Sequence, residues 1–258
     1  MRDATQRQQL ILQQLRQHGQ VVVDELAQQL RTSSVTIRKD LSSLEQEGKL
    51  IRRYGGAVPT QAESTELPVA NEQVSKRKLA IAEKALELIP DGARILLDGG
   101  STVGALLPLL AKRQGLVIMT NSPQAAAQLC ELHSEPTVLM TGGTWDATSR
   151  SLQGRMAERV LREYDFDLAF VGAAGLDIER GSTTYNELTG LTQVMAEVAA
   201  RVVLLSASDK LDKRMPNVEL GWEKIDVLVT DEQMPLTAQQ QIKNQQVEVL
   251  IAAAIADS

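Results

Sequence analysis

The stretch SSVTIRKDL, residues 33–41, decides the fold of the N-terminal part of this chain. It places Arg38 and Lys39 side by side, after small hydroxyl residues and inside an apolar pattern of helical period. A basic pair on a helix is most often only a solvated surface. The meaning of these two residues therefore depends on the sequence around them.

The apolar residues of this region predict a helix. They recur at i, i+4 and i+7 and so form one buried stripe, made of Ile37, Leu41 and Leu44. We expect Ser33 or Ser34 to be the N-cap and Gly48 to end the helix. A shorter apolar helix precedes it, across a polar turn at residues 31–33. Two helices joined by a tight turn, the second with a polar N-terminal half facing outward, form a helix-turn-helix.

Residues 50–58 predict a small β-ribbon directly after that helix. Two short strand-like segments, 50–53 and 57–58, flank a turn that contains Gly55 and Gly56. Arg52 and Arg53 lie on this ribbon, which has the position of a wing. The combination of turn, apolar stripe and basic ribbon favours DNA binding over a solvated surface.

The distribution of charge points the same way. The 258 residues carry a net charge of −6, yet residues 1–56 contain nine Arg and Lys against six Asp and Glu. The rest of the chain contains 18 basic and 27 acidic residues. Such asymmetry suggests one part that meets a polyanion and another that does not.

A helix that reads DNA needs long cations for phosphates and short hydroxyls for base edges. We expect base edges or their nearest phosphates to be contacted by Ser34, Thr36 and Arg38, and the DNA backbone mainly by Lys39, Arg52 and Arg53. Ser33, at the start of the same helix, completes the predicted DNA-binding set.

The longer run SSVTIRKDLSSLEQEGKLIRRYGGAV resembles the signature of the DeoR family of bacterial sugar-operon repressors. The resemblance implies a winged helix-turn-helix at residues 1–58, with the helix from Ser34 to Glu47 in the major groove of double-stranded operator DNA. Residues 59–70, which are polar and lack periodicity, are the predicted linker.

Residues 71–258 predict an α/β domain that begins with an amphipathic helix at 71–89. Near-continuous β-branched and aliphatic runs alternate with helical stretches, which predicts a mostly parallel sheet covered on both faces. The runs lie at 94–98, 116–120, 137–141, 167–172, 201–206, 227–231 and 247–252.

Four of these runs end in small polar residues, at the sheet edge where open α/β sheets bind ligands. The Gly-Gly-Ser-Thr sequence after Asp98 should open a helix from about Thr102 to Lys112, whose free N–H groups suit a phosphate. The resulting effector-binding set consists of Asp98, Gly100, Ser101, Thr102, Thr120, Asn121, Ser122, Gly142 and Gly143.

The family resemblance extends over this part and adds Glu187 and Lys210 to the effector set. It implies a fold similar to ribose-5-phosphate isomerase and a phosphorylated sugar or polyol as effector. LLDGGSTV, VIMTNS, TTYNE and MPNV are most similar to the repressors of glucitol (sorbitol) operons, so glucitol 6-phosphate is the specific prediction. This chain departs from many relatives at Ala174 and Ala207, where they carry Asp.

The competing hypothesis is a sugar-phosphate isomerase or transferase with a DNA-binding segment. Isomerisation needs a general base, for which Asp98 and Asp177 are candidates. Asp98 is better explained by hydrogen bonds to loop N–H groups or sugar hydroxyls, so we expect a regulator without catalytic residues.

Several other classes are disfavoured. One cysteine and two histidines give no metal-site spacing, and no cofactor is expected. Cys130 reads as a buried apolar residue. The lack of a signal-like or membrane-spanning run predicts a cytoplasmic protein. A single winged domain binds DNA weakly, so we expect a homo-oligomer, dimer or tetramer, with residues 71–89 or 247–256 at the contact.

Overall fold

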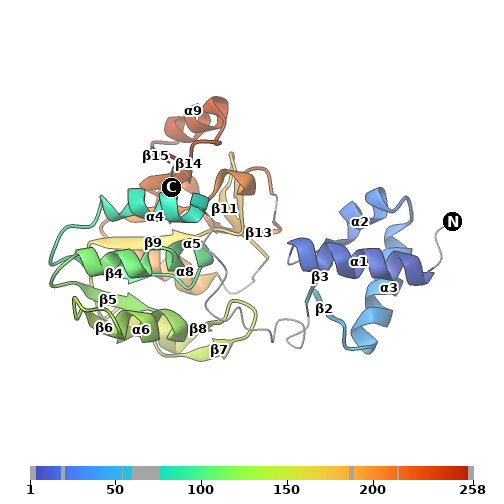
Figure 1. Cartoon of the computed structure of the whole chain (residues 1–258), viewed down its shortest axis with the longest axis horizontal. Helices are drawn as coiled ribbons and strands as arrows, with labels where there is room; N and C mark the ends of the chain where they lie inside the picture. The colour runs from blue at the N-terminus through green and yellow to red at the C-terminus, as the bar shows by residue number, and fades with distance from the viewer. Residues whose placement is uncertain are drawn as a thin grey trace. The chain divides into compact units, whose positions relative to one another are not determined.

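The computed structural model describes residues 4–18, 21–53, 55–59, 76–185, 189–213 and 215–254 (Figure 1). The chain divides into two compact units, residues 1–72 and residues 73–258. Of the predicted linker, Pro59 belongs to a strand of the first unit, and residues 60–70 lie outside the described part.

The first unit is a winged helix-turn-helix, as predicted. Its helices are α1 (Ala4–His18), α2 (Val23–Gln29) and α3 (Ser34–Gln46), and its strands are β1 (Val21–Val22), β2 (Leu50–Arg53) and β3 (Gly56–Pro59). The three strands form an antiparallel sheet in the order β1-β3-β2. The wing is the β2–β3 hairpin, and the predicted DNA-reading helix is α3.

The core of this unit confirms the predicted stripe of α3. Ile37, Leu41 and Leu44 are buried together with apolar residues of α1, α2 and the sheet. A polar contact that the periodicity did not reveal also joins α1 to α3. The Arg7 guanidinium donates two hydrogen bonds to the buried carboxylate of Asp40, one of them 3.0 Å long from Nη2 to Oδ1.

The second unit is built on a seven-stranded parallel sheet in the order β15-β14-β12-β9-β4-β5-β6. These strands are β4 (Arg94–Leu97), β5 (Val117–Thr120), β6 (Thr137–Met140), β9 (Leu168–Gly172), β12 (Val202–Leu205), β14 (Val227–Asp231) and β15 (Glu248–Ala252). Each coincides with one of the predicted runs to within one residue at either end.

Helices cover both faces of this sheet. One face carries α4 (Lys76–Leu86), α5 (Ser101–Gly104), the 3-10 helix η1 (Leu107–Lys112) and α6 (Pro123–Cys130). The other carries α7 (Arg155–Leu161), α8 (Gly190–Glu197) and α9 (Leu236–Asn244).

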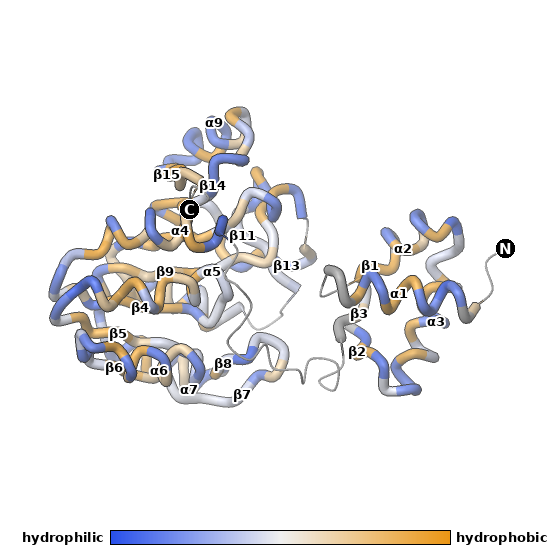
Figure 2. The backbone as a smooth tube through the Cα atoms, viewed as in Figure 1, coloured by the Kyte–Doolittle hydropathy of each residue, from blue (hydrophilic) through white to orange (hydrophobic). Residues whose placement is uncertain are grey.

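Successive strand residues alternate between the two layers, so that Ile95 and Leu97 pack on the first and Leu96 on the second. In Figure 2 the tube through the central strands is mostly orange. Both faces of the sheet are thus apolar, which explains why its strands read as near-continuous hydrophobic runs.

Two smaller sheets lie beyond the carboxyl ends of the parallel strands and were not predicted. One is the hairpin of β7 (Thr144–Asp146) and β8 (Ser151–Gln153). The other is antiparallel, in the order β10-β11-β13, with β10 (Gly175–Asp177), β11 (Gly181–Thr184) and β13 (Asn217–Leu220). The remaining elements are the 3-10 helices η2 (Ser208–Lys210) and η3 (Trp222–Lys224).

Three expectations are corrected. The continuous helix 102–112 is wrong, because α5 ends at Gly104 and the separate η1 begins at Leu107, with Pro108 in its first turn. The described part of helix 71–89 buries its apolar side on the sheet, which removes that side as an oligomer contact. Cys130, at the end of α6, is exposed rather than buried.

None of the helices in the described ranges is both long and apolar enough to span a membrane.

Candidate DNA-binding and effector sites

The N-terminal turn of α3 gathers most of the predicted DNA-binding residues. Ser33 is the N-cap, since its Oγ accepts a hydrogen bond of 3.1 Å from the Thr36 N–H and lies 2.9 Å from the Thr36 Oγ1. The side chains of Arg38 and Lys39 are exposed one turn further along. The first two turns of α3 therefore carry hydroxyls and then cations outside the buried stripe.

The wing is held against the same helix. The Arg52 guanidinium donates a hydrogen bond of 2.6 Å to the Ser42 Oγ, and the Arg52 backbone N–H donates one of 3.0 Å to the Glu45 carboxylate. These contacts bring the exposed Arg52 to the surface of α3. The backbone of Arg53 lies on β2, and its side chain is outside the described atoms.

One residue of this surface was missed by the sequence analysis. Val35 is 72% exposed, between Ser34 and Thr36 on the first turn of α3. The signal was available, because Val35 falls outside the stripe of Ile37 and Leu41. Apolar side chains in the major groove contact the methyl group of thymine, so we add Val35 to the candidate DNA-binding residues.

The candidate effector site lies where the order of the parallel strands reverses. From β4 the chain runs outward through β5 to β6, and then returns to β9 on the other side of β4. Asp98 follows β4 at this switch point, and ligands bind at such points in open α/β sheets. Its carboxylate accepts hydrogen bonds from the N–H groups of Gly99, at 2.7 Å, and Gly172, at 3.5 Å.

Asp98 is thus fixed by the loops of two neighbouring strands. Burial raises the pKa of its carboxyl group, and the hydrogen bonds from Gly99, Gly172 and the Asn121 amide act in the opposite direction. The backbone at Gly100 passes close beside it, because a Cβ built on Gly100 would lie 3.4 Å from the Asp98 Oδ2. The predicted Asp98 and Gly100 therefore belong to one site.

Ser101 and Thr102 lie on the short helix α5 beside this carboxylate. The Ser101 Oγ accepts a hydrogen bond of 3.1 Å from the Lys78 ammonium, which comes from the first turn of α4. Lys78 was missed by the sequence analysis, since a lysine on an amphipathic helix reads as a surface charge. A helix of four residues has a weak dipole. The Lys78 ammonium therefore provides the positive charge that the N-terminus of the predicted helix, residues 102–112, would have provided.

Asn121 lies on the next loop and joins the same site. Its Nδ2 lies 3.5 Å from the Asp98 Oδ1, whereas its buried Oδ1 has no hydrogen-bond partner among the described residues. The two neighbouring residues of the predicted effector set, Thr120 and Ser122, are better explained by hydrogen bonds that stabilise this turn. Thr120 accepts a hydrogen bond of 3.1 Å from the Ser122 N–H, and the Ser122 Oγ caps α6 through the Ala125 N–H.

Gly142 and Gly143 follow β6, two strands away from Asp98 in the sheet. Gly143 has a φ of 112°, and a Cβ on it would lie 2.6 Å from the carbonyl oxygen of Gln153. The backbone conformation and this close approach are therefore sufficient to require glycine at position 143, without a role in effector binding. Another predicted effector residue, Glu187, lies outside the described residues.

Lys210 and Glu219 complete the charges at the site. The Lys210 ammonium, from η2 after β12, donates a hydrogen bond to the carbonyl oxygen of Ala173. Burial and the neighbouring Lys78 lower the pKa of Lys210. Glu219, from β13, was not predicted. Burial and the proximity of Asp98 raise its pKa to about 7, and its Oε1 accepts a hydrogen bond of 3.0 Å from the Thr192 hydroxyl.

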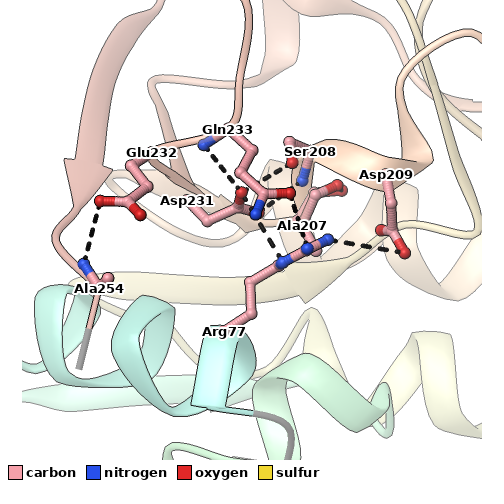
Figure 3. A network of polar contacts seen from close by, with 9 residues as sticks. Arg77, Ala207, Ser208, Asp209, Asp231, Glu232, Gln233 and Ala254 are labelled. Carbon is pink, nitrogen blue, oxygen red and sulfur yellow. Dashed lines mark hydrogen bonds and ion pairs between the residues drawn. The ribbon is translucent and has the colours of Figure 1, made fainter. Parts of the chain in front are cut away.

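A buried polar network supports the loop that carries Lys210. The Asp231 carboxylate, at the end of β14, accepts hydrogen bonds of 2.7 Å from both the N–H and the hydroxyl of Ser208. Figure 3 shows Arg77 rising from the start of α4 toward Asp231, Asp209 and Gln233. Its nearest ion-pair distances are 3.8 Å to Asp231 and 3.9 Å to Asp209. Asp209 therefore faces Arg77, one residue before Lys210.

Comparison with known proteins agrees with this architecture. Residues 7–62 match the DeoR-like helix-turn-helix domain, and residues 73–232 match the DeoR C terminal sensor domain. The chain belongs to the DeoR family. It is accordingly a transcriptional regulator with a DNA-binding domain and a sensor domain.

Three curated relatives align along nearly their whole length. The putative aga operon transcriptional repressor of Escherichia coli O157:H7 is 35% identical over 96% of this chain and 93% of that protein. The HTH-type transcriptional regulator GlpR of Haloferax volcanii is 34% identical over 90% and 91%. The transcriptional repressor AccR of Agrobacterium fabrum is 31% identical over 87% and 88%.

Two solved structures resemble part of the chain in fold alone. Ribose 5-phosphate isomerase A from Methanocaldococcus jannaschii has a TM-score of 0.40 and 23% identity, and the match covers 56% of each chain. The translation initiation factor eIF-2B of Pyrococcus horikoshii has a TM-score of 0.43 and 15% identity, covering 60% of this chain and 62% of that one.

Proposed function

We propose that this DeoR-family regulator represses a sugar or polyol catabolic operon and is released from its operator by a phosphorylated sugar or polyol. The observation that carries the proposal is that Lys78 donates a hydrogen bond to Ser101, and Lys210 donates one to the Ala173 carbonyl oxygen, in the two loops that hold Asp98 at the switch point of the sheet. Two relatives are named as repressors, which supports repression of the operon rather than activation.

The cations of the site suit the phosphate end of such a ligand, and its acidic and amide groups suit the end that carries hydroxyl groups. Lys78, Lys210 and the Ser101 hydroxyl can hold a phosphate, since ammonium groups bind phosphate as charge-assisted donors. Asp98 and Asn121 can accept or share hydrogen bonds with hydroxyl groups. Glucitol 6-phosphate is our specific candidate, on the basis of the sequence resemblance.

The geometry favours regulation over catalysis. A general base must be available to take a proton from the substrate. Asp98 is engaged with two backbone N–H groups, and Asp177 accepts hydrogen bonds from the Arg180 guanidinium and from the N–H groups of residues 179 and 180. Both candidate bases of the isomerase hypothesis therefore have structural roles.

The effector site is tested by the substitution Ser101→Asp. The new carboxylate would pair with Lys78 and repel a phosphate, so release of operator DNA by glucitol 6-phosphate should be lost while DNA binding stays intact. Operator release is measured by fluorescence anisotropy. Ala127→Asp adds the same charge at an exposed position of α6 and should change nothing. If release persists undiminished in Ser101→Asp, the effector does not bind at this loop.

The DNA interface is tested by comparing Arg38→Ala with Arg52→Ala. Loss of a base contact at Arg38 should cost about 1–3 kcal/mol on the cognate operator, whereas Arg52→Ala should weaken specific and non-specific DNA alike and flatten the salt dependence. Val35→Ser should weaken only the specific complex. Titrations at several salt concentrations separate these effects, and unchanged operator binding by Arg38→Ala would remove α3 from the groove.

We also propose that the regulator acts in the cytoplasm as a homo-oligomer, dimer or tetramer, so that two winged domains grip paired half-sites. Strand β15 stands at one end of the parallel sheet and is a candidate contact. Light scattering should show more than one chain per particle at micromolar concentration. A monomer that still binds operator tightly would contradict this.

A further inference from the structure

Glu219 lies where strand β13 has one residue more than its partner β11. Ser182 pairs with Leu220 but Thr183 pairs with Val218, so Glu219 is the extra residue of a β-bulge. Adjacent side chains of a regular strand point to opposite faces, and a bulge re-aims one of them. Leu220 is buried, Val218 is 38% exposed, and Glu219 between them is only partly exposed.

The bulge brings the Glu219 carboxylate to the effector site. Its Oε1 accepts the hydrogen bond from Thr192 on α8, which holds the side chain in place. Strand β13 pairs with β11, and β11 pairs with β10, which begins three residues after Gly172, the residue whose N–H donates to Asp98. The small sheet that carries Glu219 therefore follows directly on the loop that holds Asp98, and the charges of Asp98 and Lys210 both affect the pKa of Glu219.

Two deeply buried polar atoms of the same site have no partner within the described residues. They are the Asn121 Oδ1 and the Thr102 Oγ1, in side chains that are each 1% exposed. Asn121 is next to Asp98, and Thr102 follows Ser101. A buried acceptor without a donor is unfavourable, so these atoms indicate a ligand that brings hydroxyl groups.

We propose that Glu219 is a specificity-determining residue of the effector site, which accepts hydrogen bonds from hydroxyl groups on the carbon chain of the ligand. This inference rests on the proposed function and deepens it. Lys78 and Lys210 hold the phosphate, whereas Glu219, Asp98 and Asn121 read the hydroxyl-bearing part. The site accordingly takes a phosphate ester rich in hydroxyl groups and discriminates against analogues that lack them.

The experiment measures binding to the full chain by calorimetry with three probes: glucitol 6-phosphate, fructose 6-phosphate and inorganic phosphate. Glu219→Ala should weaken the better sugar phosphate about tenfold to a hundredfold, because the hydrogen bonds that its carboxyl group accepts from the ligand are lost. It should leave inorganic phosphate within about twofold, since that probe has no carbon chain. Glu219→Gln keeps the shape and one acceptor oxygen, so it should be intermediate. Glu223→Gln removes an exposed carboxylate on η3 and is the matched control.

The outcomes separate this inference from the proposed function. Ser101→Asp should weaken all three probes, inorganic phosphate included. If the wild type binds a sugar phosphate and Ser101→Asp does not, but both Glu219 variants keep the affinities of the wild type, the inference is overturned and the proposed function stands. If Glu219→Ala lowered the affinities for sugar phosphate and for inorganic phosphate equally, Glu219 would have only a structural role, and the inference would also be overturned. A wild type that binds neither sugar phosphate overturns the proposed function and this inference with it.

Discussion

Replacing Asp40 with alanine is expected to destabilise the DNA-binding domain by about 3–5 kcal/mol and to abolish operator binding. The Asp40 side chain is buried, and it is the partner of the Arg7 guanidinium that joins α1 to α3. Removing the carboxylate leaves a partly buried cation without its counter-charge. Hydrogen exchange of the full chain should show lost protection at residues 4–59 and unchanged protection in the sensor domain.

Two further variants make this test specific. Glu47→Ala removes an exposed acid at the end of α3, whose pair with Lys49 lies in solvent, and should leave the stability of the domain nearly unchanged. The double variant Arg7→Leu with Asp40→Leu removes both charges and should recover much of the stability, because apolar residues can replace a buried pair. A fully protected DNA-binding domain in Asp40→Ala would show that the pair contributes little.

The winged domain illustrates what a single sequence does and does not reveal. The stripe of Ile37, Leu41 and Leu44, the serine N-cap and the glycine turn of the wing are local patterns, and each predicted its element. The Arg7–Asp40 pair joins residues 33 positions apart, and Asp40 looks like a surface acid within the basic run of α3. Such a contact depends on how two helices pack, which periodicity does not specify.

The sensor domain shows the same division. Its seven parallel strands were predicted because burial on both faces leaves an apolar run in the sequence. The break between α5 and η1 was also readable, since Pro108 lies inside the predicted helix and lacks the N–H that a helix interior needs. Asp98, Ser101 and Asn121 came together as expected, because carboxyl ends of parallel strands share one edge.

Two charged residues of the candidate effector site, Lys78 and Glu219, could not be predicted in the same way. Lys78 reaches Ser101 from a helix that precedes the sheet, and Glu219 is aimed by a bulge whose register depends on strand β11. Neither position stands at the end of a parallel strand. The sequence therefore indicates where the candidate effector-binding loops lie, and the tertiary structure determines which side chains face them.

Replacing Asp231 with alanine is expected to destabilise the sensor domain by about 2–4 kcal/mol and to remove the response to the effector. The buried carboxylate of Asp231 accepts the N–H and hydroxyl of Ser208 and the N–H of Gln233, all of which would lose their acceptor. Because Ser208 begins the 3-10 helix that carries Lys210, the cation would lose its position as well. Urea unfolding of the full chain and operator release by glucitol 6-phosphate measure the two effects.

Arg77→Ala is the matched control for this network. Arg77 is partly exposed and its ion-pair distances of 3.8 Å and 3.9 Å are long, so its loss should cost less than about 1 kcal/mol. Asp231→Ala and Arg77→Ala with equal effects would mean that the guanidinium, and not the hydrogen bonds of Ser208, holds this loop.

The pH dependence of the same variant provides an independent check. Burial alone would raise the pKa of Asp231, but the hydrogen bonds from Ser208 and Gln233 and the Arg77 charge outweigh it and hold the pKa below its ordinary value of 3.8. A carboxyl group with a lowered pKa contributes stability that is present above the unfolded value and lost as the pH falls through the folded value. The difference in unfolding free energy between wild type and Asp231→Ala should therefore stay constant from about pH 8 to about pH 5 and shrink in more acidic solution. A difference that has already vanished near neutral pH would show that the ionised carboxylate of Asp231 does not stabilise this loop.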